Sequence, residues 1–314
     1  MGNYNLNNAK RAKADEFYTR LEDIEKELRH YDFKGKKVYC NCDNPSMSNF
    51  YKYFKLNFNY LGIKELISTG YNSDGRGHYG HYDGITETIK DLKGNGDFRS
   101  EECIEFLKEA DVVVTNPPFS LFREYVAQLM EYGKKFLIIG NMNAITYKEI
   151  FPYVKNNELW WGASIHSGDR KFYVPDNYPL NAATCGVDEN GKRFVRVKGI
   201  RWWTNIENTT HSTPMDLYKK YSADEYPKYD NYDAINVDKT ADIPMDYEGV
   251  MGVPITFLDK YCPTQFEIVD ARDVALNDKQ RNKSTYLIKD ADGAINGKPT
   301  YARICIRKRL FSAN

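Results

Sequence analysis

The sequence predicts an α/β fold built on a doubly wound, mostly parallel sheet. Between residues 37 and 140, short apolar runs alternate with amphipathic helical stretches, and the connections are short, as in sheets of parallel strands joined by helices. The stretch Asp111-Val-Val-Val-Thr-Asn116 holds three consecutive β-branched residues, which is typical of a strand buried on both faces. With 314 residues, 41% of them apolar, the chain can form one large domain or two ordinary ones.

The first elements are indicated by turn and capping residues. Thr19 and Glu22 have the spacing of a capping box, which predicts that a helix begins there. Residues 37–42 form the first expected strand. Asn44 and Pro45 follow it as the expected N-cap and first position of the next helix.

The next stretch combines two expected strands with a glycine-rich segment. Residues 65–69 are the second expected strand and residues 86–92 the third. Residues 70–84 contain five glycines, which favours a flexible aromatic loop. His78 and His81 have a spacing that a metal pair could use, but no third ligand lies nearby in the sequence, so the loop is the favoured interpretation.

A second pair of helices and strands completes the predicted sheet. Residues 94–99 form a turn, and Ser100 can cap the helix after it. The buried strand 111–115 ends at Asn116-Pro-Pro, because proline cannot donate to a strand ladder. Ser120 can cap the following helix, and residues 134–140 form a further strand.

The pattern of predicted strands and helices changes beyond about residue 155. Short strand-like runs separated by polar turns replace the alternation of strands and helices, and residues 207–248 are polar and weakly periodic. We expect one domain over residues 1–206 and a second region over residues 207–314, with recognition elements beginning near residue 160.

Net charge, apolar runs and cysteine spacing limit the classes of protein to which the chain can belong. The formal net charge is zero, so any nucleic-acid surface must be local. The chain has no signal peptide and no apolar stretch that could span a bilayer, which predicts a cytoplasmic protein without membrane contact. None of the cysteines has paired zinc spacing, and we expect all of them to be reduced. These cysteines are Cys40, Cys42, Cys103, Cys185, Cys262 and Cys305.

The turn after residue 115 contains side chains and carbonyl groups that could bind a substrate. In open α/β sheets, ligands bind at the carboxyl ends of the strands. Asn116 offers a carbonyl oxygen, Pro117 and Pro118 fix the direction of the backbone carbonyls, and Phe119 offers a flat ring. Together they suit a planar base with an exocyclic amine. The competing interpretation is a strand that simply ends in a proline-capped turn.

Three strand-end turns occur in a recognisable order: Asp43-Asn-Pro, Gly96-Asp97-Phe98 and Asn116-Pro-Pro-Phe119. This order resembles the amino-methylating DNA methyltransferases, and it is most similar to the EcoRI-type adenine-specific family. The upstream segment Asp15-Glu-Phe-Tyr18-Thr19 is similar to the methionine-pocket motif of such enzymes. The stretches 38–54, 201–205 and 250–258 also look like stretches of that family.

The resemblance implies a Rossmann-like fold that uses S-adenosylmethionine, releases S-adenosylhomocysteine and needs no metal. Asn116 and Pro117 would grip the target amine, and Phe119 would stack on the target base. The implied catalytic residues are Asn116, Pro117, Pro118 and Phe119. The implied cofactor-binding residues are Tyr18, Thr19, Cys42, Asp43, Pro45, Asp97, Phe98 and Asn116.

Two features depart from the family pattern. Ser46, Ser48 and Asn49 stand where glycines usually follow the first acidic residue. The acid that usually holds the ribose hydroxyls is not evident after Thr69, and Asp74 is the nearest candidate.

The predicted reaction is methyl transfer to N6 of an adenine that has flipped out of duplex DNA. The resemblance implies a monomer or weak dimer from a bacterium or phage, and it leaves open a cognate restriction endonuclease encoded nearby. Basic and aromatic residues of the second half are candidate DNA contacts, although each could instead belong to a solvated strand face or the core. These candidates are Arg201, Trp202, Trp203, Arg303 and Arg307.

Two alternatives stay open. The same turn also serves methylation of RNA adenine and of glutamine side chains in proteins, because a planar amine or amide is common to all three substrates. A nucleic-acid-binding protein with this fold and no activity is the other alternative, and the altered first motif is its support.

Overall fold

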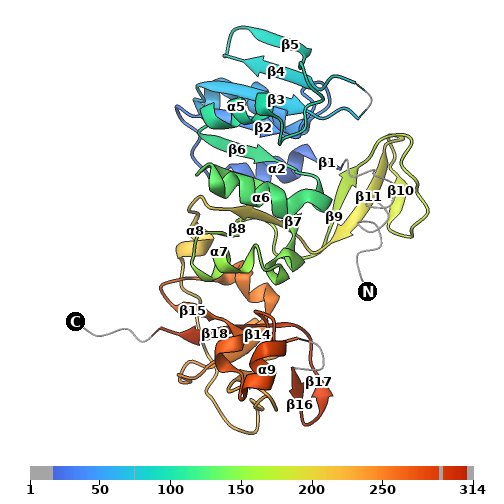
Figure 1. The fold of residues 1–314 in the computed structure, drawn as a ribbon. Helices are drawn as coiled ribbons and strands as arrows, with labels where there is room; N and C mark the ends of the chain where they lie inside the picture. The colour runs from blue at the N-terminus through green and yellow to red at the C-terminus, as the bar shows by residue number, and fades with distance from the viewer. Residues whose placement is uncertain (1–16, 74, 290–292, 310–314) are drawn as a thin grey trace. The chain divides into compact units, whose positions relative to one another are not determined.

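The computed structural model describes residues 17–73, 75–289 and 293–309, and the chain divides into two compact units (Figure 1). Unit 1 comprises the residues up to Met142 together with Gly162–Ile206, and unit 2 comprises Asn143–Trp161 together with the residues from Glu207 onward. One division therefore falls at 206/207. Residues 143–161, which the expected first domain includes, belong to unit 2.

Unit 1 is built on a mixed sheet with the strand order β5-β4-β3-β2-β6-β7-β12. The central strands β3, β2, β6 and β7 run parallel, whereas β4, β5 and β12 are antiparallel to their neighbours. The strands are β2 (Lys37–Asn41), β3 (Glu65–Gly70), β4 (His78–Tyr82), β5 (Glu87–Asp91), β6 (Val112–Thr115), β7 (Lys135–Asn141) and β12 (Ile200–Thr204).

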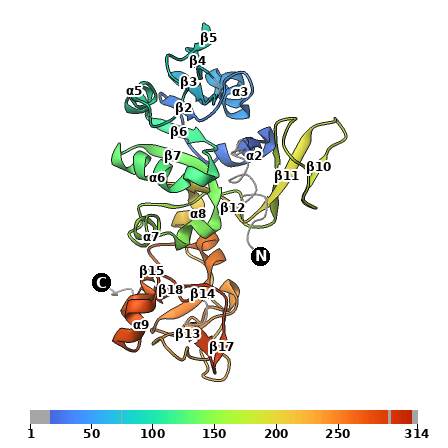
Figure 2. The same cartoon turned by 45° about the vertical axis from the view of Figure 1, so that its right-hand side comes forward.

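Helices cover both faces of this sheet, with α2 and α3 on one side and α5 and α6 on the other (Figure 2). Parallel strands need such crossover connections, and covered faces explain why the first three residues of β6 are all valine. The helices of unit 1 are α2 (Leu21–Leu28), α3 (Asn49–Leu56), α4 (Phe58–Leu61), α5 (Glu101–Glu109), the 3₁₀ helix η1 (Phe119–Leu121) and α6 (Phe122–Glu131).

Three of the four predicted helix caps are wrong. Thr19 lies in a strand, and Arg20 takes the N-cap position of α2 without a side-chain cap. Helix α3 begins at Asn49, where Ser48 Oγ accepts the amides of Phe50 and Tyr51, so the Asn44 cap is displaced by four residues. Leu121 takes the N-cap position of α6, because a 3₁₀ turn containing Ser120 precedes that helix. Ser100 caps α5 as predicted.

The glycine-rich segment after β3 is not a flexible loop. It contains β4, which pairs with β3 and β5. Its glycines allow close approach: a Cβ at Gly80 would lie 2.5 Å from Pro45 Cβ, so this strand can run past the turn after β2 only with glycine there. His81 Nε2 donates to the Glu65 carboxylate at 2.9 Å, which gives the histidine a structural partner.

A second, antiparallel sheet in unit 1 has the order β1-β9-β11-β10. Its strands are β1 (Tyr18–Thr19), β9 (Asp169–Tyr173), β10 (Cys185–Val187) and β11 (Arg193–Lys198). The loop that leads into it is held by Glu27 of α2, whose fully buried carboxylate accepts the amides of Ala163 (2.8 Å) and Ser164 (2.7 Å) and the hydroxyl of Tyr31 (2.7 Å).

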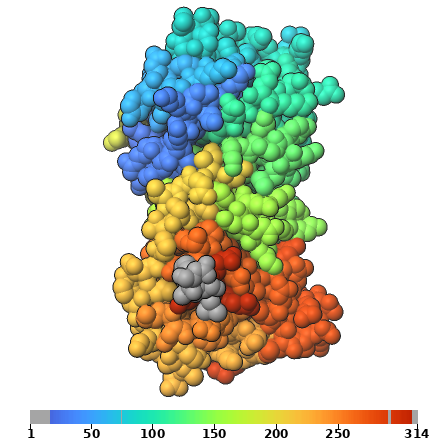
Figure 3. Space-filling model, turned by 90° about the vertical axis from the view of Figure 1, so that its left-hand side faces the viewer, coloured from blue at the N-terminus to red at the C-terminus, as the bar shows by residue number. Residues whose placement is uncertain are grey.

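Unit 2 is built on a smaller sheet with the order β13-β14-β18-β15, and its orange and red segments form a closely packed body in Figure 3. Tyr229, Tyr232 and Ile288 belong to its core. Its elements are the 3₁₀ helix η2 (Met142–Thr146, which begins at the last residue of unit 1), α7 (Phe151–Lys155), β8 (Trp160–Trp161), α8 (Thr209–Ser212), β13 (Ile235–Asn236), η3 (Thr240–Asp242), β14 (Met251–Pro254), η4 (Ile255–Lys260), β15 (Phe266–Val269), η5 (Ala271–Val274), α9 (Asp278–Lys283), β16 (Ala294–Ile295), β17 (Lys298–Pro299) and β18 (Arg303–Lys308).

Within the described ranges, no helix is long and apolar enough to cross a membrane. The cysteines are all free thiols, as expected.

Candidate active site

The carboxyl ends of β2 and β6 bring two of the predicted turns together. The two strands are parallel neighbours, so the residues that follow them, Asp43 and Asn116, lie at the same edge of the sheet. Thr115, the last residue of β6, donates its hydroxyl both to the carbonyl of Asn41 and to the Asp43 carboxylate. The backbone amide of Asn116 also bonds to Asp43. Asp43 therefore links the end of β2 to the Asn-Pro-Pro-Phe turn.

The Asp43 carboxylate accepts hydrogen bonds from residues of two elements, strand β6 and the N-terminus of helix α3. Besides the bonds from β6, Ser48 Oγ donates to its carboxylate at 2.7 Å, and the same hydroxyl caps α3. Burial raises the pKa of Asp43 to about 7, and the hydrogen bonds from Thr115, Ser48 and the Asn116 amide act in the opposite direction. A carboxyl group with this pKa changes its charge near neutral pH.

The Asn116 side chain has a fixed orientation. Its amide nitrogen donates to the backbone carbonyl of Phe17 at 2.5 Å. This bond assigns the nitrogen to one side of the amide and turns Oδ1 the other way. Oδ1 is buried and has no hydrogen-bond partner among the described residues. Buried polar atoms are normally paired, so this acceptor is suited to a donor from outside the chain.

Phe119 follows in a 3₁₀ turn and is half-buried. Its ring lies 5.4 Å from the ring of Phe17 and 6.1 Å from that of Phe172, measured between centroids. Pro117 is buried, and the Pro118 carbonyl accepts the Leu121 amide at 3.0 Å. The proline pair thus fixes the turn, while Phe17 contacts both its asparagine and its aromatic ring.

Tyr18 and Thr19, the residues predicted to hold the methionine end of the cofactor, form β1. They directly follow Phe17, which contacts Asn116 and Phe119 of the catalytic turn. The Asn49 amide donates to the Thr19 carbonyl at 2.7 Å, which ties β1 to helix α3. The Tyr18 hydroxyl approaches the sulfur of Met47 at 3.9 Å. Thr19 Oγ1 is buried and has no partner in the part of the chain that the structure describes.

The remaining predicted cofactor residues differ in accessibility. Cys42 adopts a left-handed conformation with φ 67°, and burial raises the pKa of its thiol, with the charges of Asp43 and Asp97 adding to this effect. Asp97 is chelated by Arg99, whose Nε and Nη2 lie 2.9 and 2.7 Å from its carboxylate oxygens, and these bonds lower the pKa of Asp97. Its oxygens are therefore already engaged from one side.

Phe98 and Pro45 are both buried. Phe98 is 3% exposed and packs edge-on against Tyr125, with ring centroids 5.0 Å apart. The turn before it depends on Gly96, which has φ 79° and lies directly against the carbonyl of Gly70 at the end of β3. This close approach brings the Asp97 turn to the same edge of the sheet.

Four residues that sequence reasoning did not single out take part in the site: Phe17, Asn41, Ser48 and Thr115. Asn41 Oδ1 accepts the Cys42 amide at 2.9 Å and the Thr69 hydroxyl at 3.1 Å. Its Nδ2 is buried without a partner among the described residues. A polar residue at the end of an apolar strand was the available signal for Asn41 and Thr115.

These orphaned atoms test the fit to a cofactor. Thr19 Oγ1, Asn41 Nδ2 and Asn116 Oδ1 are buried, have no partner among the described residues, and lie on segments that hydrogen bonds connect. A hydroxyl, an amide donor and an amide acceptor suit a ligand that is itself rich in donors and acceptors. Over the described ranges, no group of three or more His, Cys, Asp or Glu side chains could hold a metal ion.

Four of the five predicted DNA contacts, Arg201, Trp202, Trp203 and Arg303, are buried in the structure. Trp202 and Trp203 are fully buried and point to opposite faces of the sheet, against Phe50 and Phe122 respectively. Arg201 is 2% exposed and donates to the carbonyls of Ile200 and His166. These three residues belong to β12, which is buried along its whole length.

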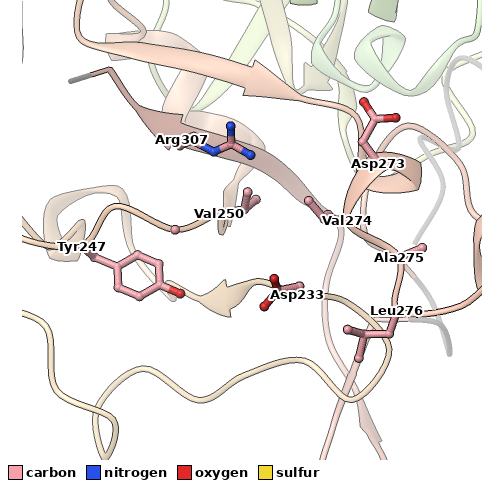
Figure 4. A pocket seen from close by; sticks show the side chains of 9 residues that line it. Asp233, Tyr247, Val250, Asp273, Val274, Ala275, Leu276 and Arg307 are labelled. Atoms are coloured by element: carbon pink, nitrogen blue, oxygen red, sulfur yellow. The ribbon is translucent and has the colours of Figure 1, made fainter. Parts of the chain in front are cut away.

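The two arginines of β18 differ. Arg303 is 8% exposed and lies 3.5 Å from Asp238, so it is a structural residue as well. Arg307 is 46% exposed and pairs with Glu267 at 3.1 Å. It lines a cavity of about 470 Å³ in unit 2. Figure 4 shows its guanidinium with Asp233, Tyr247 and Asp273 around this cavity.

Comparisons with known proteins give a consistent picture. The model of a family described as adenine-specific methyltransferase EcoRI matches residues 5–309. The type II methyltransferase M.EcoRI of Escherichia coli is 47% identical, over 97% of each chain. M.MgeORF184P of Mycoplasma genitalium is 41% identical, over 98% of this chain and 99% of that one. M.MpnI of Mycoplasma pneumoniae is 39% identical, over 97% and 98%.

Proposed function

The chain belongs to the EcoRI family of adenine-specific methyltransferases, and from this premise we propose that it methylates N6 of adenine within a specific sequence of duplex DNA. Its relatives that are called type II methyltransferases span its whole length, which supports a modification enzyme of a restriction–modification system. The observation that carries the proposed mechanism is the buried Oδ1 of Asn116, which has no partner in the described part of the chain.

S-adenosylmethionine is the proposed cofactor, and when bound it supplies an electrophilic methyl group. Tyr18 and Thr19 of β1 would hold its methionine end. Cys42 and Asp43 follow β2, and Asp97 lies in the turn that Gly96 holds against the end of β3, so all three would face its remaining polar groups. The unpaired atoms of Thr19, Asn41 and Asn116 support this assignment, because a ligand of this kind can satisfy each of them.

The task of the protein is to orient the target amine. The lone pair of an adenine amine is delocalised into the ring, so the amine is a poor nucleophile. Two acceptors, Asn116 Oδ1 and the Pro117 carbonyl, would hold its two hydrogens and turn the lone pair out of the ring plane. Orientation of this kind can contribute roughly 7–11 kcal/mol to catalysis.

Phe119 would receive the flipped base. An amine inside a duplex cannot be reached, so the base must leave the stack at a cost of a few kcal/mol. Stacking on an aromatic ring recovers about 1–3 kcal/mol per base. The contact between Phe119 and Phe17 supports this role, since it holds the ring beside the residue whose carbonyl orients Asn116.

Asp43 is proposed as a positioning residue. It binds the backbone amide of Asn116 and the hydroxyl of Thr115, so it fixes the start of the catalytic turn. It also receives Ser48 from helix α3. Asp43 would thereby link the residues that bind the cofactor to the turn that holds the target base.

Unit 2 is the proposed recognition region, and Arg307 is its predicted DNA contact with an exposed side chain. An arginine at the wall of a cavity can read a guanine edge or hold a phosphate. We propose further that one chain suffices, as a monomer or weak dimer acting in the cytoplasm, and that a cognate endonuclease is encoded nearby.

The test uses labelled S-adenosylmethionine with duplex DNA, single-stranded DNA, RNA and a protein extract, each digested and analysed by mass spectrometry. N6-methyladenine in duplex DNA, at one sequence, is the expected product. Label in RNA adenine or in protein glutamine would replace the substrate while keeping the catalytic turn. An absence of label, together with an absence of cofactor binding, would reject the function.

A further inference from the structure

The outer face of strands β9 and β11 carries alternating basic and aromatic side chains. The two strands pair so that Phe194 faces Tyr173 and Arg196 faces Lys171, which places these four side chains on one side of the sheet. The residues between them, Phe172, Val195 and Val197, are buried on the other side. We call the outer set, together with Lys192 and Lys198, the aromatic–basic face. It belongs wholly to unit 1.

The rings of this face hold its cations. Lys171 Nζ lies 4.3 Å from the centre of the Phe194 ring and 5.3 Å from that of Tyr173. Arg196 lies over the Phe194 ring at 5.4 Å, and Lys192 over the Tyr173 ring at 5.2 Å. Such cation–π contacts fix charged groups without neutralising them. The face therefore presents positive charge in a defined arrangement.

One acidic residue, Asp188, offsets part of the charge of this face, because its carboxylate pairs with Lys171 Nζ at 3.4 Å. Asp188 accepts the amides of Lys192 and Asn190 within its own turn, and these bonds lower its pKa together with the Tyr173 hydroxyl and Lys171. It serves to shape the turn between β10 and β11. Asp169 stands opposite Lys198 in the register. Arg196 and Lys198 are exposed.

The aromatic–basic face is connected to the candidate active site through strand β9. Strand β9 pairs with β1, where Tyr18 stands opposite Tyr173. On the inner side of the same strand, Phe172 contacts the rings of both Phe17 and Phe119. The aromatic–basic face is thus a continuation of the strands that support the catalytic turn, and it lies within the same compact unit.

We propose that the aromatic–basic face binds the sugar–phosphate backbone of the substrate duplex next to the target base. The inference rests on the proposed function, and it assigns a share of DNA binding to a face of unit 1 that lies within the region beyond residue 160 where recognition elements were expected. The charge suits a polyanion, and the position beside the catalytic turn suits the strand that carries the target adenine.

A duplex backbone fits better than an unpaired base that stacks on the rings. Both rings are already covered by cations. The Phe194 ring also lies close over Gly186 of β10, where a Cβ would stand 2.9 Å from its Cζ. Occupied rings cannot act as an open stacking platform, whereas exposed side chains such as Arg196 and Lys198 can contact phosphates.

The experiment compares two double variants of the whole protein, Arg196→Ala/Lys198→Ala and, as a control with the same change in charge, Lys52→Ala/Lys64→Ala. Lys52 and Lys64 are exposed residues of unit 1 that lie outside the aromatic–basic face. The affinity for a fluorescent duplex that contains the methylated sequence is measured by anisotropy over a range of salt concentrations. Turnover at saturating DNA and the affinity for S-adenosylmethionine are measured alongside.

For the Arg196/Lys198 variant we expect at least about tenfold weaker DNA binding and a salt dependence reduced by about 0.9 per lost phosphate contact, hence by about 2 in the log–log slope. Turnover at saturating DNA and the affinity for S-adenosylmethionine should match those of the control. Equal DNA affinity and equal slope in the two variants would overturn the inference. So would a loss of affinity confined to single-stranded DNA, which would indicate base stacking instead.

The same experiment separates this inference from the proposed function. If the unaltered protein methylates duplex DNA while both variants bind it equally well, only the aromatic–basic face is rejected. If the unaltered protein neither binds nor methylates duplex DNA, the proposed function itself fails.

Discussion

The side-chain amide of Asn116 donates to the backbone carbonyl of Phe17 across 99 positions of the sequence. Phe17 thereby decides which end of the amide is presented, and the end presented is the oxygen. A carbonyl oxygen can accept a hydrogen from an amine, whereas the NH₂ end cannot. The orientation of the proposed catalytic group therefore depends on a residue that precedes the first strand of the main sheet.

Replacing Asn116 with alanine removes the acceptor without altering the buried strand before it. If this oxygen acts in the transition state, we expect kcat to fall by at least about 100-fold, the range seen when one transition-state hydrogen bond is lost. Cofactor affinity, measured by calorimetry, should change far less. Turnover close to that of the unaltered protein would contradict the mechanism.

Phe119 offers a test of the stacking role. A Phe119→Ala variant should lose about 1–3 kcal/mol of interaction with the flipped base, or roughly 5- to 150-fold in kcat/KM for DNA. Because Phe119 also packs on Phe17 and Phe172, a matched Phe119→Leu variant preserves much of the packing and removes only the aromatic face. If the leucine variant equals the unaltered enzyme while the alanine variant is impaired, the ring serves packing and not stacking.

Asp43 predicts a dependence of stability on pH. Its pKa in the folded protein is about 7, above the ordinary value of 3.8, so between these values the folded state holds a proton that the unfolded state has lost. The stability that this residue contributes should therefore be present at pH 4 and be lost as the pH rises towards 7. The displacement corresponds to at most about 4 kcal/mol, and less where solvent reaches this half-buried residue.

The measurement is urea unfolding of the protein and of the Asp43→Asn variant from pH 4 to pH 8. Subtracting one curve from the other removes the contribution of the other titrating groups. We expect the difference in stability to change across this window and to level off above about pH 7.5. A difference that stays constant would show that Asp43 does not titrate there.

Glu27 tests the anchoring of the loop that precedes the aromatic–basic face. Removing its carboxylate by Glu27→Ala leaves the buried amides of Ala163 and Ser164 and the Tyr31 hydroxyl without this acceptor. At about 1–3 kcal/mol for each unsatisfied group, we expect the free energy of unfolding to fall by at least about 3 kcal/mol. Glu27→Gln, which keeps an acceptor, should cost less, and Tyr31→Phe about 1 kcal/mol. Equal losses in all three variants would contradict this account.

The parts of the fold that were predictable are those where pattern and turn chemistry agree. The first three residues of β6 are all valine because both faces of the strand are covered, and the strand is followed by Asn116 and two prolines. Ser100 caps α5 as its local sequence predicts, with its side chain accepting the Cys103 amide. Ser48 displaced the expected Asn44 cap, since its hydroxyl serves both helix α3 and Asp43, a role that only the folded sheet edge creates.

Other features could not be read from the sequence, for physical reasons. The glycines before and within β4 are the usual sign of a loop, yet they are present here because Pro45 and Asn44 lie against them. Trp202 and Trp203 face opposite sides of a covered sheet, and neither alternation nor composition distinguishes that from a DNA-contacting strand. The bond between Asn116 and Phe17 joins distant positions with no local signal at all.

The division of the chain into units also limits how such a protein can fold during synthesis and how its sequence can evolve. Because the chain passes between the units at 142/143, 161/162 and 206/207, neither unit corresponds to one continuous stretch of the gene. During synthesis, β12 leaves the ribosome only after the first segment of unit 2, so unit 1 cannot complete its sheet until part of unit 2 exists. If unit 2 is the recognition region, as proposed, its sequence-reading surface cannot be exchanged whole as one block of coding sequence, and accumulated substitutions within unit 2 are the simpler route to a new target.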